Sequence, residues 1–360
     1  MIAHLVFDGV SDGSLGVGLE VMGAAARLAR AGRIAAHVSE RVFRQRVVSM
    51  AGQSVRTGTG RTFAVDGPLT VRELRQGDVL VLPGLGAATE DQLDALLARE
   101  DIQRGLGMLA RLARKRVTLA ASCSATFLLA AAGVLEGRQA TTTWWLGPAF
   151  ARRFPRVSLR SDKMVVDAGD VLTAGAALAH ADLMLGIVAR TAGVSLAHQV
   201  AKFLVLDERT SQARYMVTEH IRSSDPTVLA LEAFVLANVG RQLSLHHMAR
   251  ATATSPRTLV RRVQSTLGTT PFRMAQRLRI SRAVHLLETT NESVEQIAAR
   301  VGYADPAAFR RIFRRETGAA PLAVRRGAGV ARRGEPQRAR EAAARFAQEA
   351  AATPKRRTGS

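Results

Sequence analysis

The sequence predicts an α/β domain built on a parallel sheet that is covered by helices on both faces, followed by an all-α domain. In the first 205 residues, short apolar runs without polar alternation are separated by helical patterns, which is typical of strands buried on both faces. A second observation is a helical pattern that occurs twice, fifty positions apart, between residues 244 and 326. Positive charge also gathers there, because residues 236–326 hold 16 Arg and 5 acidic residues in a chain of net charge +21.

The N-terminal part alternates between strand and helix patterns. We expect strands over short apolar runs at residues 3–7, 34–38, 78–82 and 117–121. We expect helices, with apolar residues at helical spacing, at residues 17–31, 90–98, 102–115, 124–132 and 194–206. In such folds ligands bind at the carboxyl ends of the parallel strands, so a binding site is expected at that edge.

Residues 117–135 contain no charged residue over nineteen positions, which is the length of a membrane span. The stretch is rich in Ala, Ser and Thr, so we expect a buried strand that turns into a buried helix instead. The N-terminus has no basic leader, which argues against a signal peptide. A single cysteine fits a reducing compartment. These features predict a cytoplasmic protein without a membrane segment.

Cys123 lies between the strand expected at 117–121 and the helix expected at 124–132. A thiol at that point faces a helix N-terminus, whose partial positive charge favours the thiolate, and the geometry is that of a nucleophile elbow. The flanking residues are small enough for a tight turn, although the usual glycines are missing. A cysteine nucleophile also needs a base, and His180, the other histidine near an expected strand end, is predicted to lie on a helix surface. No metal or cofactor is expected.

The repeat in the C-terminal part begins each copy with a capping residue and a proline, Ser255-Pro256 and Asp305-Pro306, so a helix must start at each. Six pairs of positions share the offset of fifty: Pro256/Pro306, Leu259/Phe309, Arg261/Arg311, Val263/Phe313, Gly268/Gly318 and Pro271/Pro321. Shorter helices at 244–251 and 293–300 precede the two copies, and a long helix at 271–288 lies between them. This is the helix-turn-helix layout, in which the second helix enters the major groove of DNA.

Each second helix has one apolar face and one arginine-bearing face. Leu259 and Val263 share the first, as do Phe309 and Phe313 in the second copy. The opposite faces carry the residues that we expect to contact DNA: Arg257, Val260, Arg261 and Gln264, then Ala307, Arg310, Arg311 and Arg314. Arginine can grip guanine bidentately and also bind phosphates. The alternative is a pair of solvated helical hairpins with charged outer faces.

The second copy resembles a known family. Ile297-Ala298, Val301-Gly302-Tyr303, Phe309, Phe313, Gly318 and Pro321 are similar to the second helix-turn-helix signature of AraC/XylS-type transcription regulators. The resemblance implies two helix-turn-helix units that are joined by a long helix and read successive major grooves. The first unit is less typical, since His246-His247 and Thr252-Ala253-Thr254 stand where the second unit has Glu295-Gln296 and Val301-Gly302-Tyr303.

The N-terminal part resembles a second family. Cys123 and the run from Phe127 to Thr142 are similar to the PfpI-type, class I glutamine amidotransferase-like domain, a flavodoxin-like sandwich. Fused to an AraC-type module, it is the arrangement of GlxA-type regulators. Members that keep a catalytic pair carry histidine where this chain has Thr143. Such domains also place an acid near the cysteine, which Glu20 or Asp12 could supply, so the candidate ligand pocket comprises Cys123, Asp12, Glu20 and Thr143.

The expected organisation is a sensor domain at 1–205, a linker at 206–235, a DNA-binding domain at 236–326 and a basic, mostly disordered tail at 327–360. We expect a sequence-specific regulator of transcription that forms a homodimer, binds double-stranded promoter DNA and senses a small molecule near Cys123. RNA polymerase is a further candidate partner. One alternative is a cysteine-dependent amidotransferase-like hydrolase with an accessory DNA-binding domain. Another is an unspecific basic protein associated with the chromosome.

Overall fold

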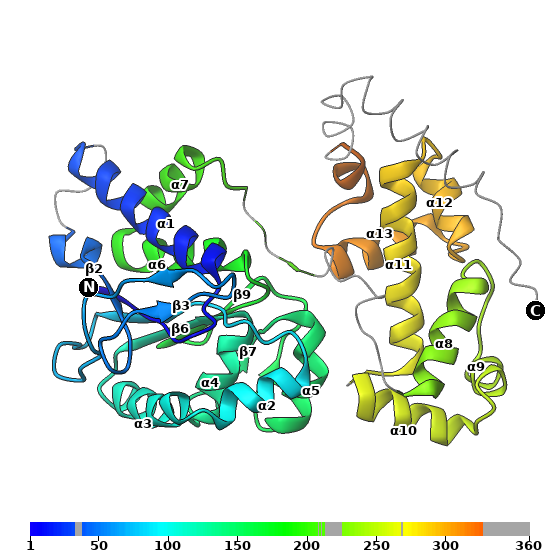
Figure 1. Ribbon diagram of the computed structural model, residues 1–360. Coiled ribbons are helices and arrows are strands. Elements are labelled where there is room, and N and C mark those ends of the chain that lie inside the picture. Colours follow the sequence, from blue (N-terminus) through cyan, green and yellow to red (C-terminus); the bar gives the residue numbers. More distant parts are fainter. Residues whose placement is uncertain (33–37, 208, 210, 213–224, 268, 327–360) are drawn as a thin grey trace, which may run out of the picture. The chain divides into compact units, whose positions relative to one another are not determined.

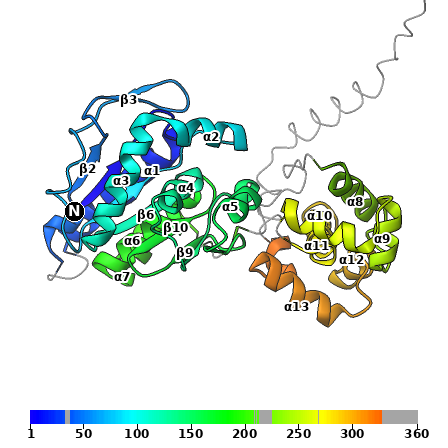
Figure 2. The same cartoon turned by 90° about the horizontal axis from the view of Figure 1, so that it is seen from below.

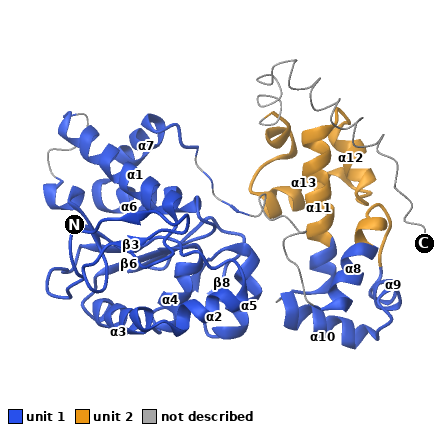
Figure 3. Ribbon diagram, viewed as in Figure 1, with its two compact units in different colours: residues 1–234, 244–275 blue, residues 235–243, 276–360 orange. Residues whose placement is uncertain are grey.

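The computed structural model describes residues 1–32, 38–207, 209, 211–212, 225–267 and 269–326. They form two compact units, the described parts of residues 1–234 with 244–275 and the described parts of residues 235–243 with 276–326 (Figure 3). Almost the whole strand expected at 34–38 and the tail expected at 327–360 lie outside the described residues. The predicted domain limits at 205, 235 and 326 stay predictions.

A six-stranded sheet forms the centre of the N-terminal part (Figure 1). Its strands are β1 (Ile2–Leu5), β2 (Gln45–Val48), β5 (Val79–Leu82), β6 (Thr118–Ser122), β9 (Val165–Asp167) and β10 (Val171–Ala174). They lie in the order β2-β1-β5-β6-β10-β9, and every pairing is parallel except that of β10 with β9. All residues of β1, β5, β6 and β10 are buried, as the unbroken apolar runs predict. The expected strands at 3–7, 78–82 and 117–121 are confirmed.

Two short pairs of strands lie outside this sheet. They are the antiparallel pair β3 (Val55–Arg56) and β4 (Thr62–Phe63), and the parallel pair β7 (Gln139–Ala140) and β8 (Ser158–Leu159). Single turns of 3-10 helix occur at η1 (Glu40–Phe43), η2 (Cys123–Ala125) and η3 (Trp144–Leu146).

Helices cover both faces of the sheet. One face carries α1 (Asp12–Arg30), α6 (Ala179–Ala192) and α7 (Val194–Phe203), and the other carries α2 (Glu90–Ala98), α3 (Glu100–Arg114) and α4 (Thr126–Ala131) (Figure 1). Figure 2 shows the domain from the side of α2, α3 and α4. A separate apolar core fills the space on each side of the sheet, and α5 (Gly147–Arg153) follows η3. The predicted α/β sandwich is therefore confirmed.

Some elements differ from the prediction. Helix α1 begins at Asp12, five residues before the expected start, because the Ser11 side chain caps it by accepting a hydrogen bond from Ser14 N. Gly13, Gly16 and Gly18 lie inside the helix, and Gly18 makes room for His180, whose Nε2 would lie 2.8 Å from a Cβ at that position. The edge strand β2 was not predicted, and the helix expected at His180 was given no bounds, which the structure sets at Ala179–Ala192.

The C-terminal part consists of helices close to the expected ones. They are α8 (Pro226–Ala237), α9 (Leu245–Ala251), α10 (Pro256–Leu267), α11 (Pro271–Thr289), α12 (Val294–Arg300) and α13 (Pro306–Thr317). Ser255 and Asp305 accept hydrogen bonds from the first turns of α10 and α13, as predicted. Gly318 ends α13 in the left-handed conformation, with a φ of 77°.

The uncharged stretch at 117–135 forms β6, η2 and α4 in the buried core, as predicted. Among the described residues, no helix combines the length and the apolar character needed to cross a membrane.

Candidate DNA-binding surface and sensor site

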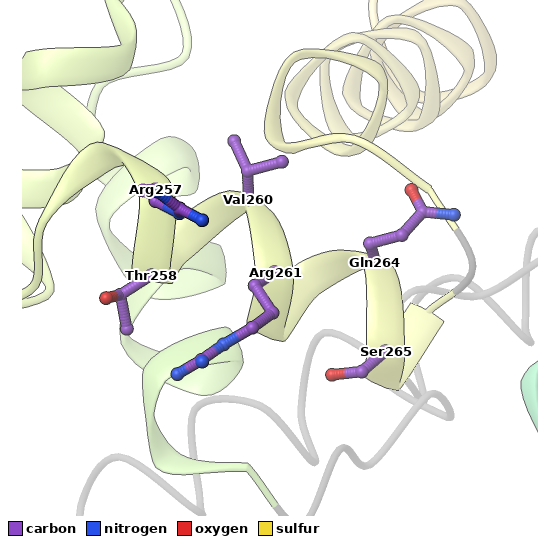
Figure 4. A pocket seen from close by; sticks show the side chains of 6 residues that line it. All are labelled: Arg257, Thr258, Val260, Arg261, Gln264 and Ser265. Atoms are coloured by element: carbon purple, nitrogen blue, oxygen red, sulfur yellow. The ribbon is translucent and has the colours of Figure 1, made fainter.

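Helix α10 buries its apolar face and exposes the face that was expected to meet DNA. Leu259 and Val263 are fully buried, whereas Arg257, Arg261 and Gln264 are exposed. Six side chains of α10 line an open hollow, shown in Figure 4: Arg257, Thr258, Val260, Arg261, Gln264 and Ser265. All four predicted contact residues of this helix therefore belong to one open surface.

Helix α13 has the same division. Phe309 and Phe313 are fully buried, and they pack with Ile297 and Val301 of the preceding segment in the core of the second unit. The ring of Phe309 lies 5.4 Å from that of Tyr303 between centroids. The opposite face, formed by Ala307, Arg310, Arg311 and Arg314, is exposed. The matching helices α9 and α12 are both held by capping boxes, which begin at Ser244 and Ser293.

The arginines of these faces differ in whether they form ion pairs with acidic residues. Arg310 donates to the Glu295 carboxylate of α12, and this pair is half exposed. Within the described parts of the chain, Arg257, Arg261, Arg311 and Arg314 have no acidic partner. Arg262, which was not among the predicted contacts, donates to Thr227 Oγ1 at 2.6 Å near the start of α8. Unpaired arginines on an exposed face are the ones most readily available to phosphates and bases.

Cys123 has the backbone geometry of a nucleophile elbow. Its φ is 56°, a left-handed value that is uncommon for a residue with a side chain, and it stands directly after β6 at the start of η2. Its N–H donates to Gly175 O at 2.7 Å, and its carbonyl accepts from Thr142 Oγ1 at 2.8 Å. Ser124 Oγ accepts from Leu85 N and donates to Leu85 O, so the turn is also tied to the loop after β5.

The thiol of Cys123 is buried, and no imidazole of the described residues is a neighbour that shifts its pKa. Burial raises the pKa of the Cys123 thiol, and the nearby hydroxyls of Ser124 and Thr143, which lower it, only partly offset this effect. Thr143, which stands where members with a catalytic pair carry histidine, is fully buried. Cys123 and Thr143 are therefore brought together as predicted, but in surroundings that disfavour the thiolate.

The two candidate acids, Asp12 and Glu20, form their hydrogen bonds and ion pair with other residues. Glu20 lies on the exposed side of α1, where its carboxylate pairs with Arg27 at 2.6 Å. The Thr57 hydroxyl contributes most to lowering the pKa of the Asp12 carboxyl, and Asp12 also accepts hydrogen bonds from the N–H and the hydroxyl of Thr59, which lower it further. The residue of α1 at the elbow is Ser14. A Cβ at Gly84 would lie 3.5 Å from Ser14 Oγ and 3.7 Å from Cys123 Sγ.

The expectation that His180 lies on a helix surface is wrong. It lies on α6, as expected, but it is fully buried, and its Nδ1 lies 2.8 Å from the Ser122 hydroxyl oxygen. His4 of β1 is also fully buried beside it, and its Nε2 lies 3.1 Å from Gln45 Oε1. Burial lowers the pKa of His180 to about 3 and that of His4 to about 4, so both imidazoles are neutral near pH 7. Periodicity could not reveal this pair because β1 and α6 are far apart in sequence.

A further buried polar residue, Gln212, was also missed. It lies in the segment expected to be a linker, yet only 1% of it is exposed, and its carboxamide contacts Thr141, Thr142 and Ser161. The only available sequence signal was a polar run, which is more typical of a solvated turn.

Comparisons with known proteins agree with this architecture. A sequence model described as the DJ-1/PfpI family matches residues 4–190, and one described as a helix-turn-helix domain matches residues 248–327. The HTH-type transcriptional regulator GlxA of Rhizobium meliloti (strain 1021) is 30% identical over 224 residues, which cover 61% of this chain and 69% of GlxA. The HTH-type transcriptional regulator CdhR of Pseudomonas aeruginosa is 28% identical over 292 residues, or 80% of this chain and 83% of CdhR.

Among solved structures, Drosophila melanogaster DJ-1beta matches 57% of this chain and 98% of its own, with 20% sequence identity and a TM-score of 0.44. The family matches place the Cys123 elbow in the first domain and the faces of α10 and α13 in the second. The chain therefore belongs to the DJ-1/PfpI family and, with an AraC-type helix-turn-helix domain following that domain, is a DNA-binding transcription regulator.

Proposed function

We propose that the protein binds promoter DNA sequence-specifically, with α10 and α13 inserted into successive major grooves. The observation that carries the proposal is the repeated division of these helices into a buried apolar face and an exposed arginine-bearing face. Arg261 and Arg311 occupy equivalent positions of the two faces and have no acidic partner within the described residues. Val260 and Ala307 would contact thymine methyl groups, since they have no hydrogen-bonding side-chain atom.

The test compares the double variant Arg261→Ala, Arg311→Ala with the wild-type chain by fluorescence anisotropy on a promoter fragment. Removing each bidentate arginine should cost about 1–3 kcal/mol of binding free energy. If an arginine binds phosphate instead, its removal should reduce the salt slope by about 0.9. Arg104→Ala on α3 removes one positive charge from an exposed side chain outside the two DNA-binding helices and should change neither quantity. An unchanged affinity and salt slope in the double variant would contradict the proposal.

Random DNA of equal length separates specific from unspecific binding. We expect the protein to stay bound to the promoter fragment when this competitor is added, because base contacts favour one sequence while phosphate contacts do not. Equal competition by both DNAs would support the hypothesis of an unspecific basic protein.

The N-terminal domain is proposed to bind a small effector at the carboxyl edge of the sheet near Cys123 and to form the homodimer. The support is the position of the elbow, because ligands of parallel α/β sheets bind at this edge. Sedimentation of the full chain tests the dimer, and promoter-reporter assays with cell metabolites test the effector. RNA polymerase in the cytoplasm is the proposed downstream partner of the bound regulator.

Cys123 is proposed to have a structural role rather than a catalytic one. The elbow geometry favours a nucleophile, but the buried thiol, its raised pKa and Thr143 in place of a base all oppose that function. Iodoacetamide at neutral pH should therefore label Cys123 more slowly than it labels free cysteine. Faster labelling would revive the hydrolase alternative.

A further inference from the structure

Gln212 lies where the chain crosses the carboxyl edge of the sheet after α7. Just before it, Arg209 pairs with Asp182 of α6 at 2.5 Å. The backbone N–H of Gln212 donates to Asp162 O at 3.0 Å, so this segment is fixed before the side chain is considered. Its side chain then points into the protein, where the residue is almost completely buried. A linker does not require such burial for a polar carboxamide.

The Gln212 amide nitrogen meets more acceptors than it can satisfy. Nε2 lies 3.1 Å from Thr141 Oγ1, 3.0 Å from Thr142 O and 3.0 Å from Ser161 O. The Thr141 hydroxyl donates its only hydrogen to Lys163 O, so it can only accept from Gln212. A carboxamide nitrogen carries two hydrogens, whereas an ammonium carries three. The geometry of the site therefore matches an ammonium group better than the amide that occupies it.

The other end of the carboxamide is poorly accommodated. No donor among the described residues reaches Gln212 Oε1, although the atom is buried. It also lies against Gly175, where a Cβ would approach it to 2.2 Å. A buried acceptor without a donor costs free energy, so the carboxamide is a suboptimal occupant of this site.

The same residues connect this site to the elbow. Thr142 accepts from Gln212 through its carbonyl and donates from its hydroxyl to Cys123 O. Gly175, which contacts Gln212 Oε1, accepts from Cys123 N. The carboxamide thus lies at the carboxyl edge of β6 and β10, where a ligand of this fold is expected.

We propose that this acceptor cluster is a binding site for the primary ammonium group of a small molecule, and that Gln212 is a tethered occupant which that ligand displaces. The inference rests on the proposed sensing function and specifies its ligand class. Thr141 Oγ1, Thr142 O and Ser161 O each accept one hydrogen of the ammonium. A quaternary ammonium has no hydrogen to donate and does not bind.

The first experiment measures binding of propylammonium, propionamide and the N-trimethyl counterpart of propylammonium to the full chain by ligand-observed NMR. The expected order is propylammonium, then propionamide, with no specific binding of the quaternary compound. Gln212→Ala removes the tethered competitor and should tighten propylammonium binding by about tenfold, because a ligand no longer competes for an occupied site. Equal binding of the primary and quaternary compounds, or no tightening in Gln212→Ala, overturns the inference.

The second experiment follows hydrogen exchange of the Gln212 backbone amide. Propylammonium should increase its exchange in the wild-type chain. Gln212→Glu should increase the exchange at position 212 without ligand, because a carboxylate would face three acceptor oxygens. Gly175→Ala should also increase the exchange of the Gln212 amide, because the added Cβ would expel Oε1. Gln92→Glu is the matched control, since it makes the same change in the capping box of α2, where Glu is equally suitable. Unchanged exchange in both Gln212→Glu and Gly175→Ala overturns the tethered-occupant assignment.

Failure of this inference differs from failure of the proposed sensing function. If a different metabolite alters promoter binding while exchange at Gln212 stays constant, sensing stands and the ammonium site is wrong. If propylammonium displaces Gln212 but promoter binding and reporter output do not change, the site is correct and its regulatory role fails.

Discussion

Acidification from about pH 7.5 to pH 5.5 should destabilise the N-terminal domain through His4 and His180. Both imidazoles are fully buried, with the neutral side chains of Gln45 beside His4 and Ser122 beside His180. Burial lowers their pKa values from 6.5 to about 4 and about 3, and the proximity of His4 adds to the lowering of the His180 pKa. The unfolded chain therefore binds more protons than the folded chain below pH 6.5, so acid favours unfolding.

The size of the effect follows from the pKa values. The histidines cost nothing well above pH 6.5, where both states are neutral, and the loss of stability grows as pH falls from 6.5 toward 4. At pH 5.5 the unfolded histidines are mostly charged and the folded ones are not, so each should reduce the free energy of unfolding by about 1.4 kcal/mol. A combined loss of about 2–3 kcal/mol is large against the roughly 5–15 kcal/mol that stabilises a typical domain.

Urea unfolding at a series of pH values, followed by the fluorescence of Trp144 and Trp145, measures the slope of the free energy of unfolding against pH. His4→Phe should reduce the slope between pH 6.5 and 5.5 by about half. His198→Gln changes an exposed histidine of α7 and should leave it unchanged. Only slopes are compared, so a general loss of stability in His4→Phe does not affect the outcome. If the slope of His4→Phe equals that of the wild type, the buried pair is not responsible for acid sensitivity.

Three further predictions test the packing and charge arguments. Glu295→Gln releases Arg310, so promoter affinity measured by anisotropy should rise by about two- to fivefold, while Glu288→Gln on α11 should have less effect. Phe309→Ala should lower the free energy of unfolding, measured by circular dichroism, by about 3–5 kcal/mol, and an unchanged value would contradict the assigned core. Gly18→Ala should lower the melting temperature because its Cβ would lie 2.8 Å from His180 Nε2, whereas Gly16→Ala, which meets nothing within 4 Å, should not.

The DNA-binding helices could be predicted because their determinants are local. Ser255 and Asp305 are followed by prolines, and Leu259 and Phe309 recur at helical spacing, so a short window of sequence contains the start, the buried face and the exposed face. The strands β5 and β6 could be predicted for a similar reason, because burial on both faces makes them unbroken apolar runs. Strand β2 lacks that signal, since it lies at the edge of the sheet and begins with Gln45 and Arg46.

The sensor site could be predicted only in part. The elbow at Cys123 follows from a strand that meets a helix, which is a local pattern, and the structure places it there. Its neighbours come from distant segments. Ser14 of α1 lies near the elbow, whereas Glu20 of the same helix pairs with Arg27 on the exposed side. Gln212 reaches the site through hydrogen bonds to Asp162, Thr141, Thr142 and Ser161, and no periodicity encodes these contacts.

The elbow therefore has a use that does not depend on a reactive thiol. Its left-handed backbone directs the N–H of Cys123 to Gly175 and its carbonyl to Thr142, and these two residues are also neighbours of the Gln212 carboxamide. A strained turn persists only where its surroundings hold it, and here the surroundings include Gln212 through its contacts with Thr142 and Gly175. The absence of a base at Thr143 leaves this arrangement intact, because it depends on backbone geometry. A fold suited to cysteine chemistry can in this way keep its turn as a support for a ligand site.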